Sequence, residues 1–120
     1  MASLCNFGVN ELPDKSPVPV RLDGETRTEF DWRVRCMEIN IREAARWDPA
    51  FRRKVDLLRE AHTTDELRNA ISELEWEQIG AERACWDNRP SHDAEQRLEK
   101  TMARLAALRL ALEESEEEKQ

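Results

Sequence analysis

Apolar residues recur three and four positions apart through most of the chain, the spacing typical of helices with one buried face. Thr26 with Glu29 three residues later is a capping box, so we predict that a first helix begins there. Asp48-Pro49 ends that helix and begins a second, shorter one, because the residue before proline avoids the helical conformation and proline suits a first helical position. The apolar stripe of the first helix comprises Phe30, Val34, Met37, Ile41 and Ala44 or Ala45.

The segment from Thr63 to Trp86 predicts one long helix, opened by a second capping box, Thr63 with Glu66. Its main stripe, which Gln78 interrupts, comprises Leu67, Ala70, Ile71, Leu74, Ala81 and Cys85. Trp76, Ile79 and Trp86 form a second apolar side. A helix that is apolar on two sides needs neighbours on both. Gly80 in its middle costs about 1 kcal/mol relative to alanine, so it indicates a close helix crossing or a slight bend.

A last helix follows the break between Asp87 and Ser91, with Ser91 as its predicted N-cap. Its heptad positions, spaced as in a coiled coil, are Ala94, Leu98, Thr101, Leu105, Leu108 and Leu112. Alanines flank this seam and allow another helix to approach closely. We therefore expect an antiparallel hairpin with the preceding helix.

Both ends of the chain differ from this helical pattern. Pro13, Pro17 and Pro19 disfavour helix near the N-terminus, where we expect an extended arm that either packs on the helices or a partner, or stays flexible. The acidic residues after Leu112 lie where the helix dipole disfavours negative charge, so we expect them to fray into a solvated tail. The predicted organisation is an arm over 1–25, an all-α domain of about four helices over 26–112 and an acidic tail over 113–120.

The net charge of −7 is concentrated at the ends, with −2 over 1–26 and −4 over 113–120. The near-neutral body argues against a broad DNA-binding face, which needs clustered Lys and Arg. Segment 63–87 carries −5 and each of 27–62 and 88–112 carries +2, so we expect the central helix to pair with its neighbours electrostatically as well. The stretch from Arg42 to Lys54 interleaves arginines with Trp47 and Phe51, a pattern that suits phosphate or RNA contacts. We favour amphipathic helix ends with extended arginine side chains, and expect no nucleic-acid partner.

Little in the sequence indicates catalysis, metal binding or membrane insertion. Cys36, His62, Cys85 and His92 do not have metal-ligand spacing, and Glu73, Glu75 and Glu77 cannot share a helix face because alternate residues point apart. We find no nucleophile motif and no glycine-rich phosphate loop. We therefore expect a non-enzyme without metal, cofactor or small-molecule substrate.

The cysteine usage and the apolar runs predict the compartment. Three cysteines, no secretory leader and no apolar run of about 20 residues predict a cytoplasmic protein with reduced thiols and no membrane partner.

The four tryptophans lie off the main stripe of their helices. Either the core uses both sides of two helices or a second chain covers them, and we favour the second because tryptophan is enriched at interface hot spots. The predicted function is a non-catalytic adaptor, accessory or assembly protein that binds a protein partner, including a second copy of itself. The predicted partner-binding residues are Trp76, Ile79, Trp86, Glu73, Glu77, Trp32 and Trp47. The alternative is a small acidic inhibitor, for example virus-encoded, that docks the α-helical acidic surface around Glu73, Glu75 and Glu77, together with the 113–118 tail, on a basic groove of a host factor or enzyme.

Overall fold

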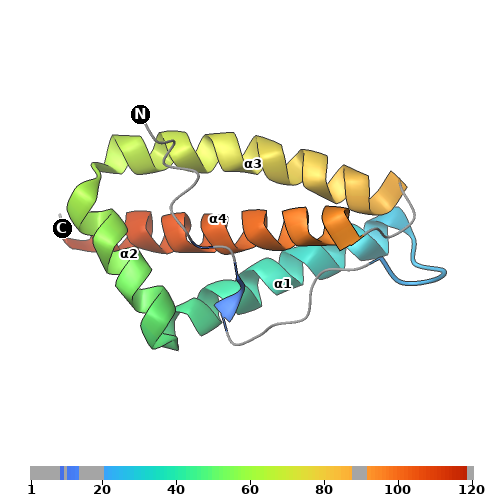
Figure 1. Cartoon of the computed structure of the whole chain (residues 1–120), viewed down its shortest axis with the longest axis horizontal. Helices are drawn as coiled ribbons and strands as arrows, with labels where there is room; N and C mark the ends of the chain where they lie inside the picture. The colour runs from blue at the N-terminus through green and yellow to red at the C-terminus, as the bar shows by residue number, and fades with distance from the viewer. Residues whose placement is uncertain (1–8, 10, 14–20, 88–91, 119–120) are drawn as a thin grey trace.

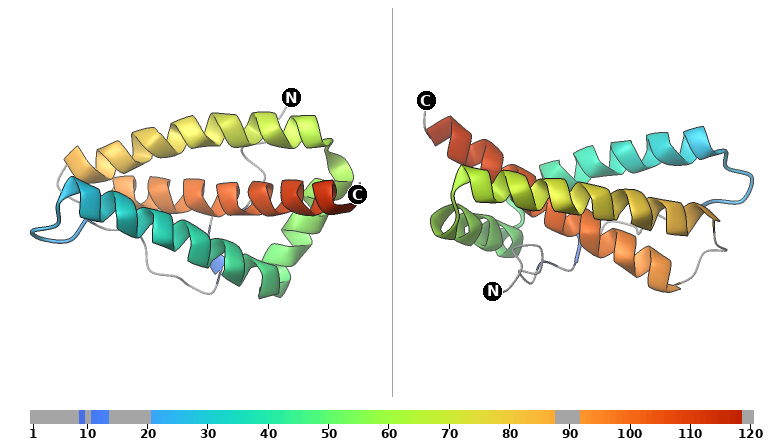
Figure 2. Two further views of the ribbon diagram at one scale, coloured as in Figure 1. Left: turned by 180° about the vertical axis from the view of Figure 1, so that it is seen from behind. Right: turned by 90° about the horizontal axis from the view of Figure 1, so that it is seen from above.

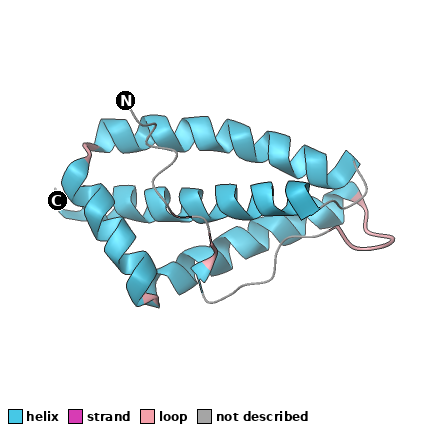
Figure 3. Ribbon diagram, in the orientation of Figure 1, coloured by secondary structure: helices cyan, strands magenta, loops and turns pink. Residues whose placement is uncertain are grey.

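The computed structural model describes residues 9, 11–13, 21–87 and 92–118, and its regular structure there is four α-helices without a strand (Figures 1 and 3). They are α1 (Arg27–Trp47), α2 (Pro49–Ala61), α3 (Thr64–Asp87) and α4 (His92–Glu118). This confirms the all-α fold. The predicted cap at Ser91 and most of the predicted arm lie outside the described residues.

The helix starts are fixed by the side chains that the sequence indicated. The Glu29 amide donates to the Thr26 hydroxyl oxygen over 3.2 Å, and the Phe51 amide donates to the Asp48 carboxylate over 3.1 Å. At α3 the capping box is reciprocal, because the Thr63 amide also donates to Glu66 over 2.9 Å. These bonds satisfy amide groups that the first turn of a helix leaves unpaired.

Helix α4 is the element around which the others pack. It forms an antiparallel hairpin with α3, lies alongside α1 and is crossed by α2 near its C-terminal end (Figure 1). Figure 2 shows α1 at an edge of the molecule in both of its views. Neighbours on several sides explain why α4 is buried around most of its circumference. Its buried residues are Ala94, Leu98, Thr101, Met102, Ala103, Leu105, Ala106, Ala107, Leu108, Leu110 and Ala111.

The other three helices each present one buried stripe to this centre. The stripe of α3 is the predicted one, with Gln78 and Glu82 buried beside it. Its second side is covered only at Trp86, which packs against Phe30 of α1, while Trp76 and Ile79 stay exposed. The expectation that α3 has neighbours on both sides is therefore met only at its C-terminal end within the described residues. Val9 and Leu12 of the N-terminal segment also join the core.

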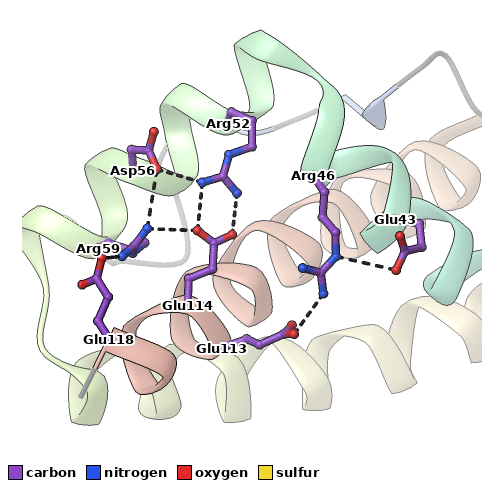
Figure 4. Close-up of polar contacts among 8 residues, drawn as sticks. All are labelled: Glu43, Arg46, Arg52, Asp56, Arg59, Glu113, Glu114 and Glu118. Atoms are coloured by element: carbon purple, nitrogen blue, oxygen red, sulfur yellow. Dashed lines mark hydrogen bonds and ion pairs between the residues drawn. The ribbon is translucent and has the colours of Figure 1, made fainter. Parts of the chain in front are cut away.

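The helix α4 continues to Glu118, six residues beyond the predicted end, so the expected fraying is wrong for the described residues. Arginines from α1 and α2 line one side of its last turns (Figure 4). The Arg46 guanidinium donates to Glu113 over 2.9 Å, and Arg59 donates to Glu114 over 2.9 Å and pairs with Glu118. Arg52 donates two hydrogen bonds to the same Glu114. We call these six residues the arginine clamp.

The predicted charge pairing is met only in part. Arg35 of α1 and Arg109 of α4 pair with Glu82 and Glu75 of the acidic α3, as expected. Arg46, Arg52 and Arg59 instead meet the acidic end of α4. Arg68 of α3 likewise pairs with Glu116 over 2.8 Å. Cations near a helix C-terminus offset both the dipole and the mutual repulsion of the glutamates.

Candidate protein-interaction surface

Three of the four tryptophans are strongly exposed. The exposed fractions are 72% for Trp32, 81% for Trp47 and 76% for Trp76. Exposed large apolar side chains that gather on one surface typically mark a binding site rather than a defect of packing. The predicted sites at these three positions are therefore available to a partner.

On the outer face of α1, apolar residues form a stripe that Glu43 interrupts before its last member. It is made up of Trp32, Cys36, Ile39 and Trp47, and we call it the α1 stripe. Ile39 is 63% exposed and Cys36 is half-buried. Because successive residues turn by about 100°, these positions lie opposite the core positions of the same helix, such as Val34 and Ile41. The amphipathic helix therefore carries apolar side chains on both faces, one inside and one outside.

On α3 the exposed apolar residues are Trp76 and Ile79, which we call the α3 patch. Glu73 and Glu77 are exposed on the same helix and lie three residues before and one residue after Trp76 in the chain. An aromatic anchor with polar neighbours resembles the core and rim of a small interface. This part of the predicted site is present as expected.

Trp86 differs from the other tryptophans, because it is packed within the molecule. Its ring lies 5.6 Å from the ring of Phe30, and the Arg21 guanidinium lies over it at 4.0 Å. Arg21 also donates to the Trp86 carbonyl oxygen over 2.7 Å. Trp86 therefore joins the C-terminal end of α3 to the start of α1, and only a part of its surface is left for a partner.

A polar cluster that the sequence did not reveal lies between α1 and α3. We call Arg35, Glu38, Gln78 and Glu82 the polar cluster; only Gln78 and Glu82 are buried in it. Gln78 donates to Glu38 and, over 3.5 Å, to Glu82. Glu82 also pairs with Arg35 at 3.2 Å. These residues line a hollow of about 170 Å³ together with Glu75, Ile79 and Arg109. The sequence pattern that indicates this cluster is Gln78 on the apolar stripe, followed by Glu82 one turn later. From the sequence alone, Gln78 is interpreted only as an interruption of the stripe.

The cluster shifts the protonation of Glu82. Burial raises the pKa of this carboxyl above its ordinary value, and the charge of Arg35 only partly offsets that effect. The Oε1 atom of Gln78 is buried without a hydrogen-bond partner in the described structure. Glu82 can therefore hold a proton, and Gln78 Oε1 can accept a hydrogen bond from a further donor. The cluster contains no nucleophile with an adjacent base.

The other candidate chemistry finds little support. Burial raises the pKa of the Cys85 thiol to about 11, and the thiol donates to the Ala94 carbonyl oxygen over 3.3 Å, so it stays protonated and unreactive at neutral pH. Within residues 9, 11–13, 21–87 and 92–118, no three His, Cys, Asp or Glu side chains converge as metal ligands would. The helices described here contain no apolar stretch of the length that crosses a bilayer.

The arginine clamp reduces the charge available to a partner on two surfaces that the sequence indicated, the basic stretch over 42–54 and the acidic tail over 113–118. Arg46 and Arg52, from the middle of the basic stretch, already hold glutamates, which leaves less positive charge for a phosphate. Glu113 and Glu114 are neutralised by the same contacts. Of the glutamates that form the predicted acidic surface, those that stay exposed are Glu73, Glu75 and Glu77 on α3 and Glu116, Glu117 and Glu118 at the end of α4.

Comparisons with protein-family models, with curated proteins and with solved structures find no match to this chain. The functional argument therefore depends on the chain's own surface.

Proposed function

We propose that this protein is a non-catalytic interaction protein that binds other protein chains through the α1 stripe and the α3 patch. The observation that carries the proposal is the exposure of Trp32, Trp47 and Trp76 on a fold whose core is complete without them. Tryptophan is enriched among the few residues that supply most interface energy.

The free energy gained by covering exposed tryptophans favours this role. An exposed indole that becomes covered removes about 150 Å² from water, which corresponds to a gross gain of about 4 kcal/mol. Part of that gain is lost to the entropy of association and to the ordering of side chains. Two or three such anchors nevertheless suffice for a specific complex of modest affinity.

The test is to compare partners captured from the native cell by the full chain and by its Trp76→Ala variant. The expected result is loss of specific partners with little change in melting temperature, because the side chain is exposed and supports no core contact. Leu57→Ala is the matched control, since Leu57 is also an exposed apolar residue but lies on α2. Unchanged capture by Trp76→Ala, or an equal loss from Leu57→Ala, would count against the α3 patch.

The acidic-inhibitor alternative is favoured by one observation, the exposed Glu73, Glu75 and Glu77 around Trp76. If this acidic surface were the main determinant, binding to a basic groove would weaken steeply as salt rises, because screening acts on exposed charges. Binding centred on Trp76 would change little with salt. Measuring the affinity of a captured partner between low and high ionic strength separates the two functions.

A further inference from the structure

We propose that the α1 stripe binds a second copy of this chain, with the two α1 helices antiparallel about a twofold axis near Ile39. This inference deepens the proposed function, because it names the partner of one of the two surfaces. The α3 patch is then left for a different protein. Neither surface depends on the other for its exposure.

The spacing of the stripe is self-complementary in the antiparallel direction. Trp32 and Trp47 lie nearly equally far from Ile39 along the chain, seven residues before it and eight after it. Pairing about this centre places Trp32 beside the partner's Trp47 and brings the two Ile39 side chains together. The two tryptophans are turned by about 60° from one another around the helix axis, so they meet side by side instead of end to end.

Charge selects the antiparallel direction over the parallel one. Glu43 lies on the stripe between Ile39 and Trp47 and is largely exposed, while Arg35 lies at the edge of the stripe and is half-exposed. Parallel pairing about the same stripe would place each Glu43 against the partner's Glu43. Antiparallel pairing separates the two Glu43 residues and places each of them one residue from the position opposite the partner's Arg35, a cation that also pairs with Glu38 and Glu82 of its own chain.

The available area fits a reversible dimer. Four exposed tryptophan surfaces of about 150 Å² each contribute about 600 Å². Ile39, Cys36 and the flanking side chains raise the total to about 1,000 Å², which is near the lower limit for a specific interface. Access is open as well, because Trp32, Ile39 and Trp47 are exposed and α1 lies at an edge of the molecule (Figure 2).

The first test measures mass by sedimentation equilibrium of the full chain across micromolar concentrations. The expected result is a monomer–dimer equilibrium that Ile39→Arg weakens at least about tenfold, because an unpaired charge would lie at the interface centre. Leu57→Arg is the matched control: its side chain is 59% exposed and lies on α2, and it should leave the equilibrium unchanged. A monomeric mass for the unchanged chain at all concentrations overturns the proposal.

The second test determines the direction of the pairing by disulfide formation. In the antiparallel arrangement two cysteines at position 39 lie next to one another, whereas the two Cys36 residues are separated by about 10 Å along the helix axis. Under mild oxidation, Ile39→Cys combined with Cys5→Ser and Cys36→Ser should give a covalent dimer. The chain with Cys5→Ser alone, which retains Cys36, should not. Rapid coupling through Cys36 indicates parallel pairing and overturns the proposed arrangement.

These outcomes are separable from those of the proposed function. A strictly monomeric chain that still captures partners through Trp76 would refute the dimer and leave the interaction role standing. A dimer that captures no Trp76-dependent partner would support the α1 stripe as a binding surface and refute the role proposed for the α3 patch. Circular dichroism of each variant checks that the helices are retained.

Discussion

Glu82 is an ionisable residue that is almost completely buried, since only 3% of it is exposed. Arg35 and Gln78 offset part of the cost of removing the carboxylate from water. Burial nevertheless raises the pKa of Glu82 above the value of 4.5 that applies in the unfolded chain. The group is therefore a source of pH-dependent instability within the fold.

The sign of that dependence is fixed by the direction of the shift. As the pH rises above about 4.5, the unfolded chain releases the Glu82 proton before the folded chain does, so the free energy of unfolding falls until the raised pKa is passed. We expect Glu82→Gln to gain stability relative to the unchanged chain across this window. Thermal unfolding from pH 4 to pH 8 checks it.

The comparison for this prediction is Glu75→Gln, because Glu75 lines the same hollow but is about half-exposed. A stability difference for Glu82→Gln that is constant across pH would show that the carboxyl titrates normally in the folded protein. Only the change of the difference with pH is diagnostic, since Glu82→Gln also removes the ion pair with Arg35.

For single residues, the sequence predicted which side chains are exposed better than it predicted which residues they contact. The three exposed tryptophans follow from their angle relative to the apolar stripes, which depends on one helix alone. The partners of Gln78 and Trp86 depend on where α1 passes α3, and helical periodicity does not specify that. Gln78 was therefore interpreted as an interruption, and Trp86 was grouped with the wholly exposed residues.

Among the elements, α4 depends most on contacts from other helices. Its last two turns carry the acidic residues that were expected to fray, and the arginine clamp holds them helical. The hydrogen bonds and charge of Arg52 lower the pKa of Glu114 below its ordinary range, and Arg59 and Arg46 contribute further. A lowered pKa means that ionised Glu114 stabilises the folded chain.

We therefore expect Glu114→Gln to destabilise the protein at pH 7, by about 1 to 3 kcal/mol as for a hydrogen-bonded, partly buried charge. The loss should disappear as the pH falls below about 4.5 and through the lowered pKa of the folded state, because Glu114 is then protonated in both states. Denaturant unfolding of both chains at pH 7 and pH 3 checks it. Glu117→Gln on the exposed side of α4 should change little at either pH.

The helix starts were predictable because each is specified by residues three or four apart. Thr26, Asp48 and Thr63 make the capping bonds that their sequences indicate. The end of α4 was not predictable in the same way, because its counter-charges come from residues about 60 positions away. Local propensity and dipole arguments assumed solvent there, and the tertiary structure supplies arginine instead.

In the molecule as a whole, α1 and α3 meet where Trp86 contacts Phe30 and are spanned at the opposite end by α2 (Figure 1). The all-α class and the α3–α4 hairpin followed from periodicity. The central position of α4 did not, although its alanine-rich flanks indicated close neighbours. The sequence favours the two-sided α3 as the centre, because an exposed and a buried apolar side look alike in a sequence.

The contact between Trp86 and Phe30 predicts a contrast between tryptophans. Trp86→Ala should lower the free energy of unfolding by about 2 to 3 kcal/mol, somewhat less than for a fully buried aromatic residue, because α1 loses its contact with the end of α3. Trp47→Ala should change it by less than about 0.5 kcal/mol, since the ring is exposed. Urea unfolding followed by circular dichroism measures both, and equal effects would contradict the packing described for Trp86.

The arginine clamp has a further consequence for shortened forms of the chain. A chain that ends at Leu112 would lose a net charge of −4 and leave Arg46, Arg52 and Arg59 on one surface with only Glu43 and Asp56 as acidic partners. An acidic protein would then present a cationic face, with the affinity for nucleic acids and other polyanions that such faces have. Binding to polyanions by a truncated chain would therefore report on the missing helix end and not on the intact molecule.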